Sequence, residues 1–169
     1  MMGEVNIPLV TTNRINDPKV AEEVLEEGCA DMISMARPFL ADPEIIKKTA
    51  EGREDEINTC IGCNQACLDH VFKRETATCL VNPRACHETE LNFLPVTKAK
   101  NIAVVGAGPA GLSCATNLAS RGHKVTLFAA APEIGGQFNI AKQVPGKEEC
   151  DEKIRYYNKK NEMNNVKWK

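Results

Sequence analysis

The chain has 169 residues and a formal net charge of -2 at pH 7. This balance favours neither nucleic acid nor an anionic membrane as a partner, and no apolar run reaches the length of a membrane-spanning helix. The first residues lack a basic segment followed by a long apolar stretch, so we expect no secretion signal and a cytoplasmic protein. Four of the eight cysteines lie between positions 60 and 79. Without a secretion signal, this crowding favours a metal or cluster site over a disulfide framework.

Residues 1–52 follow the order strand, helix, strand, helix. Short apolar runs at 7–12 and 30–35 predict the two strands. Asp17 and Asp42 are each followed by proline, and we expect them to cap the two helices. Two β-α units in succession predict a parallel α/β architecture, although two strands alone do not close a barrel.

The rest of the chain changes character twice. Residues 53–98 are polar, rich in cysteine and weakly periodic, which predicts a linker organised around something other than a hydrophobic core. The α/β pattern then resumes over residues 99–169. Strands are expected at 101–105, 124–128 and 166–168, and helices at 109–120 and 150–163.

Four cysteines carry the clearest chemical signal: Cys60, Cys63, Cys67 and Cys79. Two, three and eleven residues separate them in order. Thiolates are the ligands of iron–sulfur clusters, and a [4Fe–4S] cluster takes four of them. The first three lie close enough for one short turn to hold three corners, and the fourth closes the site. The spacing alone leaves a structural zinc site and unligated thiols open as alternatives, and Cys86 is the nearest alternative ligand.

A glycine-rich turn joins the strand at 101–105 to the helix that follows. Gly106, Gly108 and Gly111 give the pattern G-x-G-x-x-G. These glycines permit a tight turn, the close approach of a pyrophosphate, and close packing of the helix on the strand. The start of the helix, with Ala110, would then present free N–H groups to the phosphates. A turn that serves packing alone is the alternative.

The strand at 124–128 ends without the acidic residue that normally binds the cofactor ribose. Ala129 stands at this position, and the first carboxylate after it is Glu133. This departure weakens the expected ribose contact and leaves the pyrophosphate site unaffected. A glycine pair that includes Gly136 follows, next to Gln137, and glycine permits close approach of the backbone to a cofactor.

Two arginines follow the two predicted strands of residues 1–52. Arg14 comes after the first strand, and Arg37, next to Ala36, comes after the second. In β/α barrels the loops after the last two strands often hold a phosphate, and arginine suits that group through its charge and paired donors. A salt bridge between surface loops is the alternative.

Six segments of the chain, taken in order, resemble the old-yellow-enzyme-like family that includes the bacterial NADPH-dependent 2,4-dienoyl-CoA reductases and trimethylamine dehydrogenase. They are IPLVTTNRINDP, SMARPFLADP, INTCIGCNQACLDHVF, CLVNPRACHE, VVGAGPAGLSCA and EIGGQFNIAKQVPGKEE. The resemblance covers nearly the whole chain. The cysteine pattern and the GGQFNIAKQVPGKEE segment are its most specific parts.

The resemblance implies three parts. Residues 1–52 would be the last two β-α units of an FMN-binding TIM barrel, residues 53–98 a [4Fe–4S] linker, and residues 99–169 the first part of a Rossmann-like FAD-binding domain. The residues that would contact FMN are Arg14, Ala36 and Arg37, and those that would contact FAD are Gly106, Gly108, Ala110, Gly111, Ala129, Gly136 and Gln137. Most FMN contacts, the NADPH site and the catalytic residues would lie outside these segments.

The function that the resemblance implies is reduction of an unsaturated fatty acyl-CoA in fatty acid β-oxidation. Electrons would pass from NADPH to FAD, then to the cluster, then to FMN. An amine dehydrogenase or enoate reductase on the same scaffold is one alternative, and a non-enzymatic electron-transfer or zinc-binding module is another. Because the barrel and the flavin domain would both be incomplete, we expect a fragment that is inactive by itself.

Overall fold

The computed structural model describes residues 4–169, which form two compact units. The first unit is Met1–His87 and the second is Glu88–Lys169. The cysteine-rich segment up to position 87 therefore belongs to the same compact unit as the two β-α units that precede it. Each unit is described by itself below.

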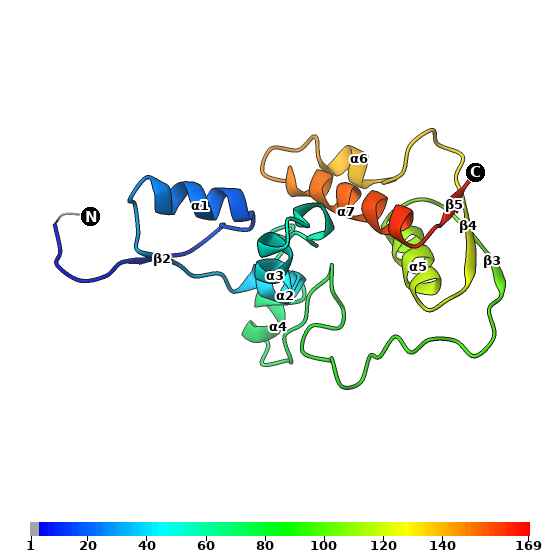
Figure 1. Ribbon diagram of the computed structural model, residues 1–169, viewed down its shortest axis with the longest axis horizontal. Coiled ribbons are helices and arrows are strands. Elements are labelled where there is room, and N and C mark those ends of the chain that lie inside the picture. Colours follow the sequence, from blue (N-terminus) through cyan, green and yellow to red (C-terminus); the bar gives the residue numbers. More distant parts are fainter. Residues whose placement is uncertain (1–3) are drawn as a thin grey trace. The chain divides into compact units, whose positions relative to one another are not determined.

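The first unit contains the two expected β-α units. Strands β1 (Val10–Thr11) and β2 (Met32–Ile33) pair in parallel, with Val10 opposite Met32. Both ladders are shorter than the apolar runs that predicted them. The other elements are α1 (Pro18–Glu26), α2 (Arg37–Ala41), α3 (Ile45–Ala50), the 3-10 turn η1 (Glu54–Glu56) and α4 (Leu68–Phe72), shown from blue to green in Figure 1.

The predicted Asp17 cap is present at α1, whereas the N-cap of α3 is Glu44 and not the predicted Asp42. The Asp17 carboxylate accepts a hydrogen bond of 2.8 Å from the backbone N–H of Lys19 at the start of α1. The Asp42 carboxylate accepts one of 3.0 Å from the N–H of Glu44, just before α3. The Asp17 cap satisfies a donor that the first turn of α1 leaves without an intrahelical partner, whereas Asp42 bonds the residue before α3 begins. The helix α2, which begins at Arg37 directly after β2, is an element that sequence periodicity did not predict.

The second unit is a parallel sheet covered by helices. Its elements are β3 (Asn101–Val105), α5 (Pro109–Ser120), β4 (Lys124–Phe128), α6 (Phe138–Ala141), α7 (Glu149–Met163) and β5 (Lys167–Trp168). The strand order is β3-β4-β5, and both pairs are parallel. Helix α5 packs on β3 and β4, and α7 packs against α5, as the yellow-green and red parts of Figure 1 show.

A hydrophobic core holds this second unit together. Leu112 and Ala115 of α5 meet Val125 and Leu127 of β4, and Tyr157 of α7 closes the cluster. Four of these five residues are at most 3% exposed. Because burying a side chain of this size stabilises a fold by about 1.5–3 kcal/mol, the core fixes where β3 and β4 end and hence where the glycine turn lies.

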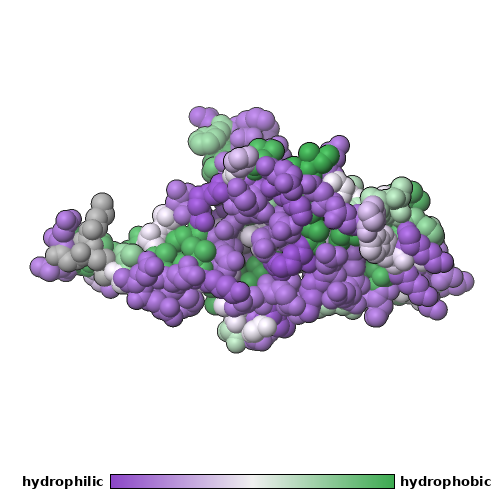
Figure 2. Space-filling model, turned by 90° about the horizontal axis from the view of Figure 1, so that it is seen from above, coloured by the Kyte–Doolittle hydropathy of each residue, from purple (hydrophilic) through white to green (hydrophobic). Residues whose placement is uncertain are grey.

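Hydrophilic residues cover most of the face shown in Figure 2, and hydrophobic residues appear there as separate smaller patches. Within residues 4–169, no helix has both the length and the apolar character needed to cross a membrane.

Candidate functional site

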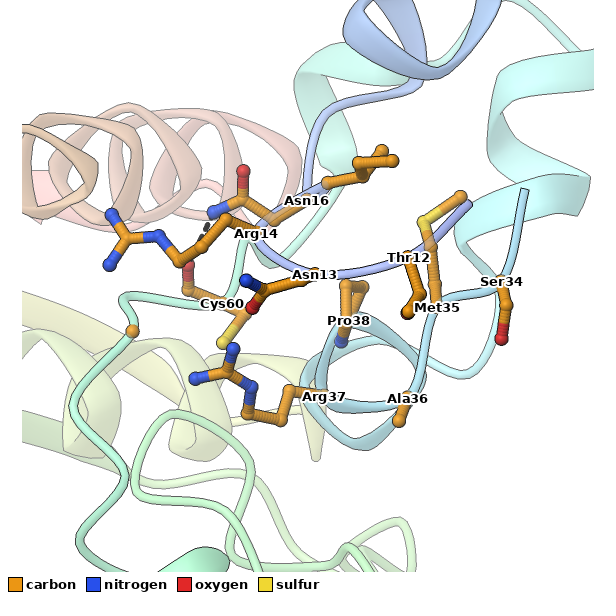
Figure 3. A pocket seen from close by; sticks show the side chains of 12 residues that line it. Thr12, Asn13, Arg14, Asn16, Ser34, Met35, Ala36, Arg37, Pro38 and Cys60 are labelled. Atoms are coloured by element: carbon orange, nitrogen blue, oxygen red, sulfur yellow. Dashed lines mark hydrogen bonds between the residues drawn. The ribbon is translucent and has the colours of Figure 1, made fainter. Parts of the chain in front are cut away.

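A pocket lies where β1 and β2 end, and we call it the strand-end pocket (Figure 3). Because the two strands are parallel, the segments that follow them meet at the same edge. Asn13 and Arg14 both have left-handed backbone conformations, with φ of 84° and 58°, which turns the chain sharply after β1. The lining residues are Thr12, Asn13, Arg14, Ile15, Asn16, Ser34, Met35, Ala36, Arg37, Pro38, Cys60 and Gly62.

Both predicted arginines line this pocket, together with Ala36. Arg37 is the first residue of α2, and its Nη1 donates a hydrogen bond of 2.5 Å to the side-chain oxygen of Asn64. Arg14 lies over Gly62, where an added Cβ would be 3.2 Å from its Nη1. Two guanidinium groups at one pocket form a site of positive charge and paired donors, which is the chemistry that binds a phosphate.

The four predicted cysteines lie around a second cavity in the same unit, which we call the thiol cavity. They come from the loop before α4 and from the segment after it. The lining residues are Arg37, Leu40, Cys60, Ile61, Cys63, Asn64, Ala66, Cys67, Cys79, Leu80 and Val81. Among the residues that the structure describes, no three Cys, His, Asp or Glu side chains are grouped closely enough to hold a single metal ion.

The thiols sit in an environment that mixes burial with hydrogen-bond donors. Burial raises the pKa of the Cys60 thiol, while a backbone hydrogen bond from Gly62 and the charge of Arg37 act in the opposite direction. Burial also raises the pKa of the Cys79 thiol, while backbone hydrogen bonds from Val81 and Asn82 act to lower it. Amide donors of this kind stabilise a thiolate and tune a group bound to it.

Asparagine side chains fix the cysteine segments to the rest of the unit. The Asn58 side chain donates to the carbonyl oxygens of Ala41 at 3.0 Å and Val81 at 2.9 Å. The side chain of Asn82 donates to the carbonyl of Leu40 at 2.9 Å. The residues before Cys60 and after Cys79 are thereby bonded to the same turn of α2. Sequence reasoning missed these contacts, because isolated asparagines carry no periodic or motif signal.

A buried ion pair lies beneath these contacts. Lys48 Nζ is 2.6 Å from a carboxylate oxygen of Asp42, with the two side chains 8% and 5% exposed. The same carboxylate oxygen accepts from the backbone N–H of Asn58 at 2.8 Å, and Lys48 also donates to the carbonyl of Glu56 at 3.1 Å. The sequence indicated only the capping role of Asp42, and its partner on α3 was not foreseen.

The predicted glycine turn lies between β3 and α5, and its three glycines differ. Gly106 has φ of +101° and its N–H donates to Phe128 at 2.8 Å. A Cβ added to Gly111 would lie 1.8 Å from the carbonyl oxygen of Gly106, whereas one added to Gly108 would meet nothing within 4 Å. Gly111 therefore permits the close packing of helix on strand, and Gly108 leaves open space in front of the turn, beside the exposed Ala110.

The second glycine segment packs directly on the first. A Cβ on Gly136, which has φ of +54°, would lie 2.9 Å from Cα of Gly108, and Gln137 follows as the N-cap of α6. Ala129, after β4, is half-buried, packs against the core and donates its N–H to Lys169 at 2.9 Å. The structure thus brings the two glycine motifs together, while the end of β4 carries no carboxylate.

Two family models match the chain, one within each unit, and neither covers the cysteine segment. Residues 1–56 match the NADH:flavin oxidoreductase / NADH oxidase family, and residues 104–167 match the NAD(P)-binding Rossmann-like domain. The chain is 48% identical over 145 residues to a metal reductase of Desulforamulus reducens, covering 86% of the chain and 22% of that protein. It is 44% identical over 147 residues to an NADH oxidase of Thermoanaerobacter brockii, covering 85% and 22%.

Solved structures show the same relationship. A 2-naphthoyl-CoA reductase in complex with 2-naphthoyl-CoA matches with a TM-score of 0.94 and 38% identity, over 99% of this chain and 26% of that one. Histamine dehydrogenase from Rhizobium sp. 4-9 matches with a TM-score of 0.85 and 32% identity, over 95% and 24%. The chain thus spans about a quarter of the length of its relatives. Its first part is similar to old-yellow-enzyme-like NADH:flavin oxidoreductases, and its second part is similar to NAD(P)-binding Rossmann-like domains.

Proposed function

We propose that this chain holds a [4Fe–4S] cluster that passes electrons from one flavin to another in a reductase that acts on an unsaturated acyl-CoA. The observation that carries the proposal is that the four cysteines line one cavity, which shares Arg37 and Cys60 with the strand-end pocket. When bound, NADPH, FAD, the cluster and FMN would supply electron transfer in that order.

We assign the four cysteines to a cluster rather than to a zinc ion because their pattern is among the most specific parts of the resemblance to cluster-containing flavin enzymes. Four thiolates around one zinc lie ~2.3 Å from the same centre, whereas the four ligands of a [4Fe–4S] cluster bind four different iron atoms and lie farther apart. The thiol cavity has all four cysteines in its wall, as a group with four thiolate ligands requires. In this assignment Cys60, Cys63, Cys67 and Cys79 hold the cluster, and amide donors beside Cys60 and Cys79 tune it.

The strand-end pocket fits the phosphate of FMN. Arg37 and Arg14 provide the charge, and Ala36 lies in the segment between β2 and Arg37. In the second unit, the open space in front of Gly108 fits the pyrophosphate of FAD, with Gly136 packed behind it. Because Ala129 provides no carboxylate, the ribose would be held by another group or by solvent.

An acyl-CoA is supported as the substrate class by the likeness to a reductase solved with 2-naphthoyl-CoA. Within that class we propose a 2,4-dienoyl-CoA. The amine dehydrogenases among the relatives, such as histamine dehydrogenase, support an amine as the second candidate. Assay of the intact protein with a dienoyl-CoA and with an amine separates the two.

The test of the cluster is anaerobic reconstitution of the chain with iron and sulfide. We expect about four iron and four sulfide per chain, and the loss of both in Cys79→Ser. Cys86→Ser is the matched control, because Cys86 lies in the same segment but outside the thiol cavity, and this variant should keep the full content. Stoichiometric zinc without sulfide, or full iron in Cys79→Ser, would overturn the proposal.

A further inference from the structure

Arg37 and Cys60 are the two residues that line both the strand-end pocket and the thiol cavity. Figure 3 shows the Arg37 side chain pointing toward Cys60. Its hydrogen bond to Asn64 holds the guanidinium beside the loop that carries Cys63 and Cys67. One cation therefore borders both sites at once.

Arg37 is also the charged side chain in the wall of the thiol cavity, whose other lining residues are cysteines, apolar residues and one asparagine. Arg37 is half-buried, so solvent screens its charge less than it would screen that of an exposed arginine. Arg14 differs, because it lines the strand-end pocket but not the thiol cavity.

We propose that Arg37 couples the two sites, so that a phosphate bound in the strand-end pocket lowers the reduction potential of the cluster. The inference rests on the proposed function, since it requires a cluster in the thiol cavity. An uncompensated guanidinium stabilises the added electron, and an anion that neutralises it removes this stabilisation. Linkage is reciprocal, so reduction of the cluster must weaken phosphate binding by the same factor.

The redox step itself is simple. An external titrant such as dithionite adds one electron to the cluster, and no bond forms or breaks at Arg37. The phosphate keeps its charge and either stays in the strand-end pocket or leaves it. In the whole protein, the coupling would make the electron acceptor in the thiol cavity respond to the phosphate group held next to it.

The experiment is an anaerobic redox titration of the reconstituted chain, followed by the electron paramagnetic resonance signal of the reduced cluster. It is done with and without saturating inorganic phosphate at constant ionic strength. We expect phosphate to lower the reduction potential of the cluster. The expected Kd for phosphate is about tenfold higher for the reduced chain, which corresponds to a shift of about 59 mV for one electron. Equal potentials with and without phosphate would overturn the inference.

Three variants assign the effect to one side chain. Arg37→Gln should lower the reduction potential measured without phosphate and should abolish the shift that phosphate causes. Arg37→Lys keeps the charge, so it should keep the reduction potential of the unaltered chain and the shift caused by phosphate. Arg14→Gln is the matched control. It should weaken phosphate binding, but at saturating phosphate the reduction potential should shift as much as in the unaltered chain. If Arg37→Gln does not fold, Arg37→Lys and the titration of the unaltered chain still decide. An unchanged potential in folded Arg37→Gln would contradict the coupling.

Two further arms separate the possible causes of failure. Riboflavin lacks the phosphate of FMN, so tighter binding of FMN than of riboflavin identifies a flavin-borne phosphate, and equal binding identifies a free one. Metal and sulfide analysis precedes every titration. Zinc in place of iron overturns the proposed function, whereas an iron–sulfur cluster that is insensitive to phosphate overturns only the coupling.

Discussion

Two glycines of the turn after β3 serve different physical purposes, although the motif treats them alike. Gly111 faces the carbonyl of Gly106 at a separation that leaves no room for a Cβ. Gly108 faces open space, and its φ of -78° is one that any residue adopts. A substitution at Gly111 therefore acts on the fold, and one at Gly108 acts on what the turn can bind.

Substitutions at Gly108 and Gly111 should therefore have different effects on stability and on cofactor binding. Gly108→Val should retain the unfolding free energy of the unaltered chain to within about 0.5 kcal/mol, but lose FAD, because its side chain fills the space of the pyrophosphate. Gly111→Ala should lose about 3 kcal/mol or more, because a Cβ there overlaps a carbonyl oxygen. Urea unfolding and flavin content of both variants provide the check. Normal FAD content in Gly108→Val would contradict the cofactor assignment.

For single residues, the sequence predicted the location of side chains that come directly after a strand or belong to a motif. Arg14 and Arg37 meet at one pocket because parallel strands end at the same edge. The Asp42–Lys48 pair was not foreseen, because burial of a lysine depends on packing that no local pattern reveals. The bond from Arg37 to Asn64 was hidden for the same reason, since 27 positions separate the partners.

The elements of the first unit are held together by polar contacts more than by a large apolar core. Asn58 joins the turn at Ala41 to the backbone at Val81, and the carboxylate of Asp42 fixes its main chain from the other side. A buried carbonyl that loses its donor costs about 1–3 kcal/mol. The position of the cysteine segment therefore depends in part on the Asn58 side chain.

Asn58→Ala should loosen the attachment of the cysteine segment to α2. We expect the unfolding free energy to fall by about 1–3 kcal/mol and a reconstituted cluster to be lost to a chelator several times faster. The measurement is the decay of cluster absorbance in excess EDTA. Asn92→Ala is the control, because Asn92 makes only an exposed local bond to Thr89. If the two variants release iron equally fast, Asn58 does not hold the segment.

Strong local patterns determined which elements could be foreseen. The bounds of β3, α5 and β4 agree with the sequence prediction, since a strand, a glycine turn and a twelve-residue helix each have their own signal. Helices α2 and α4 were missed, because five residues are too few to show a helical period. The ladders of β1 and β2 were overestimated, because the extent of a strand depends on its neighbours in the sheet.

The chain as a whole consists of two units joined by an exposed stretch. Residues 88–95 are exposed and belong to no helix or strand, and the backbone becomes fixed to the second unit at Leu94 and Val96, which bond to Arg121. Brief digestion with a protease specific for glutamate should therefore cleave first at Glu88 or Glu90, because exposed irregular chain is cleaved before folded elements. Mass spectrometry of the first fragments checks this. Early cleavage within α7, which also contains glutamates, would contradict the division.

Made alone, the 169-residue chain should show no NADPH-dependent reduction of a dienoyl-CoA. It spans 22–26% of the length of its relatives, and its strands β1 and β2 leave Val10 56% and Met32 60% exposed. A substrate of this size needs a more enclosed site than these elements provide. The assay follows NADPH oxidation after reconstitution with iron, sulfide, FMN and FAD. Turnover on the order of 1–10³ s⁻¹ would contradict the expectation.

The bonds from Asn58 and Asn82 fix the backbone on both sides of the cysteine segment to α2. Many small metal-binding domains unfold when the metal is removed, but a cluster in the thiol cavity would lie in a segment that side-chain amides also anchor. Insertion of such a cluster during biosynthesis would then follow folding and would change the structure of the segment little. Damage by oxygen would strip the iron and sulfide yet leave the segment in position, so that the same chain can be repaired rather than replaced.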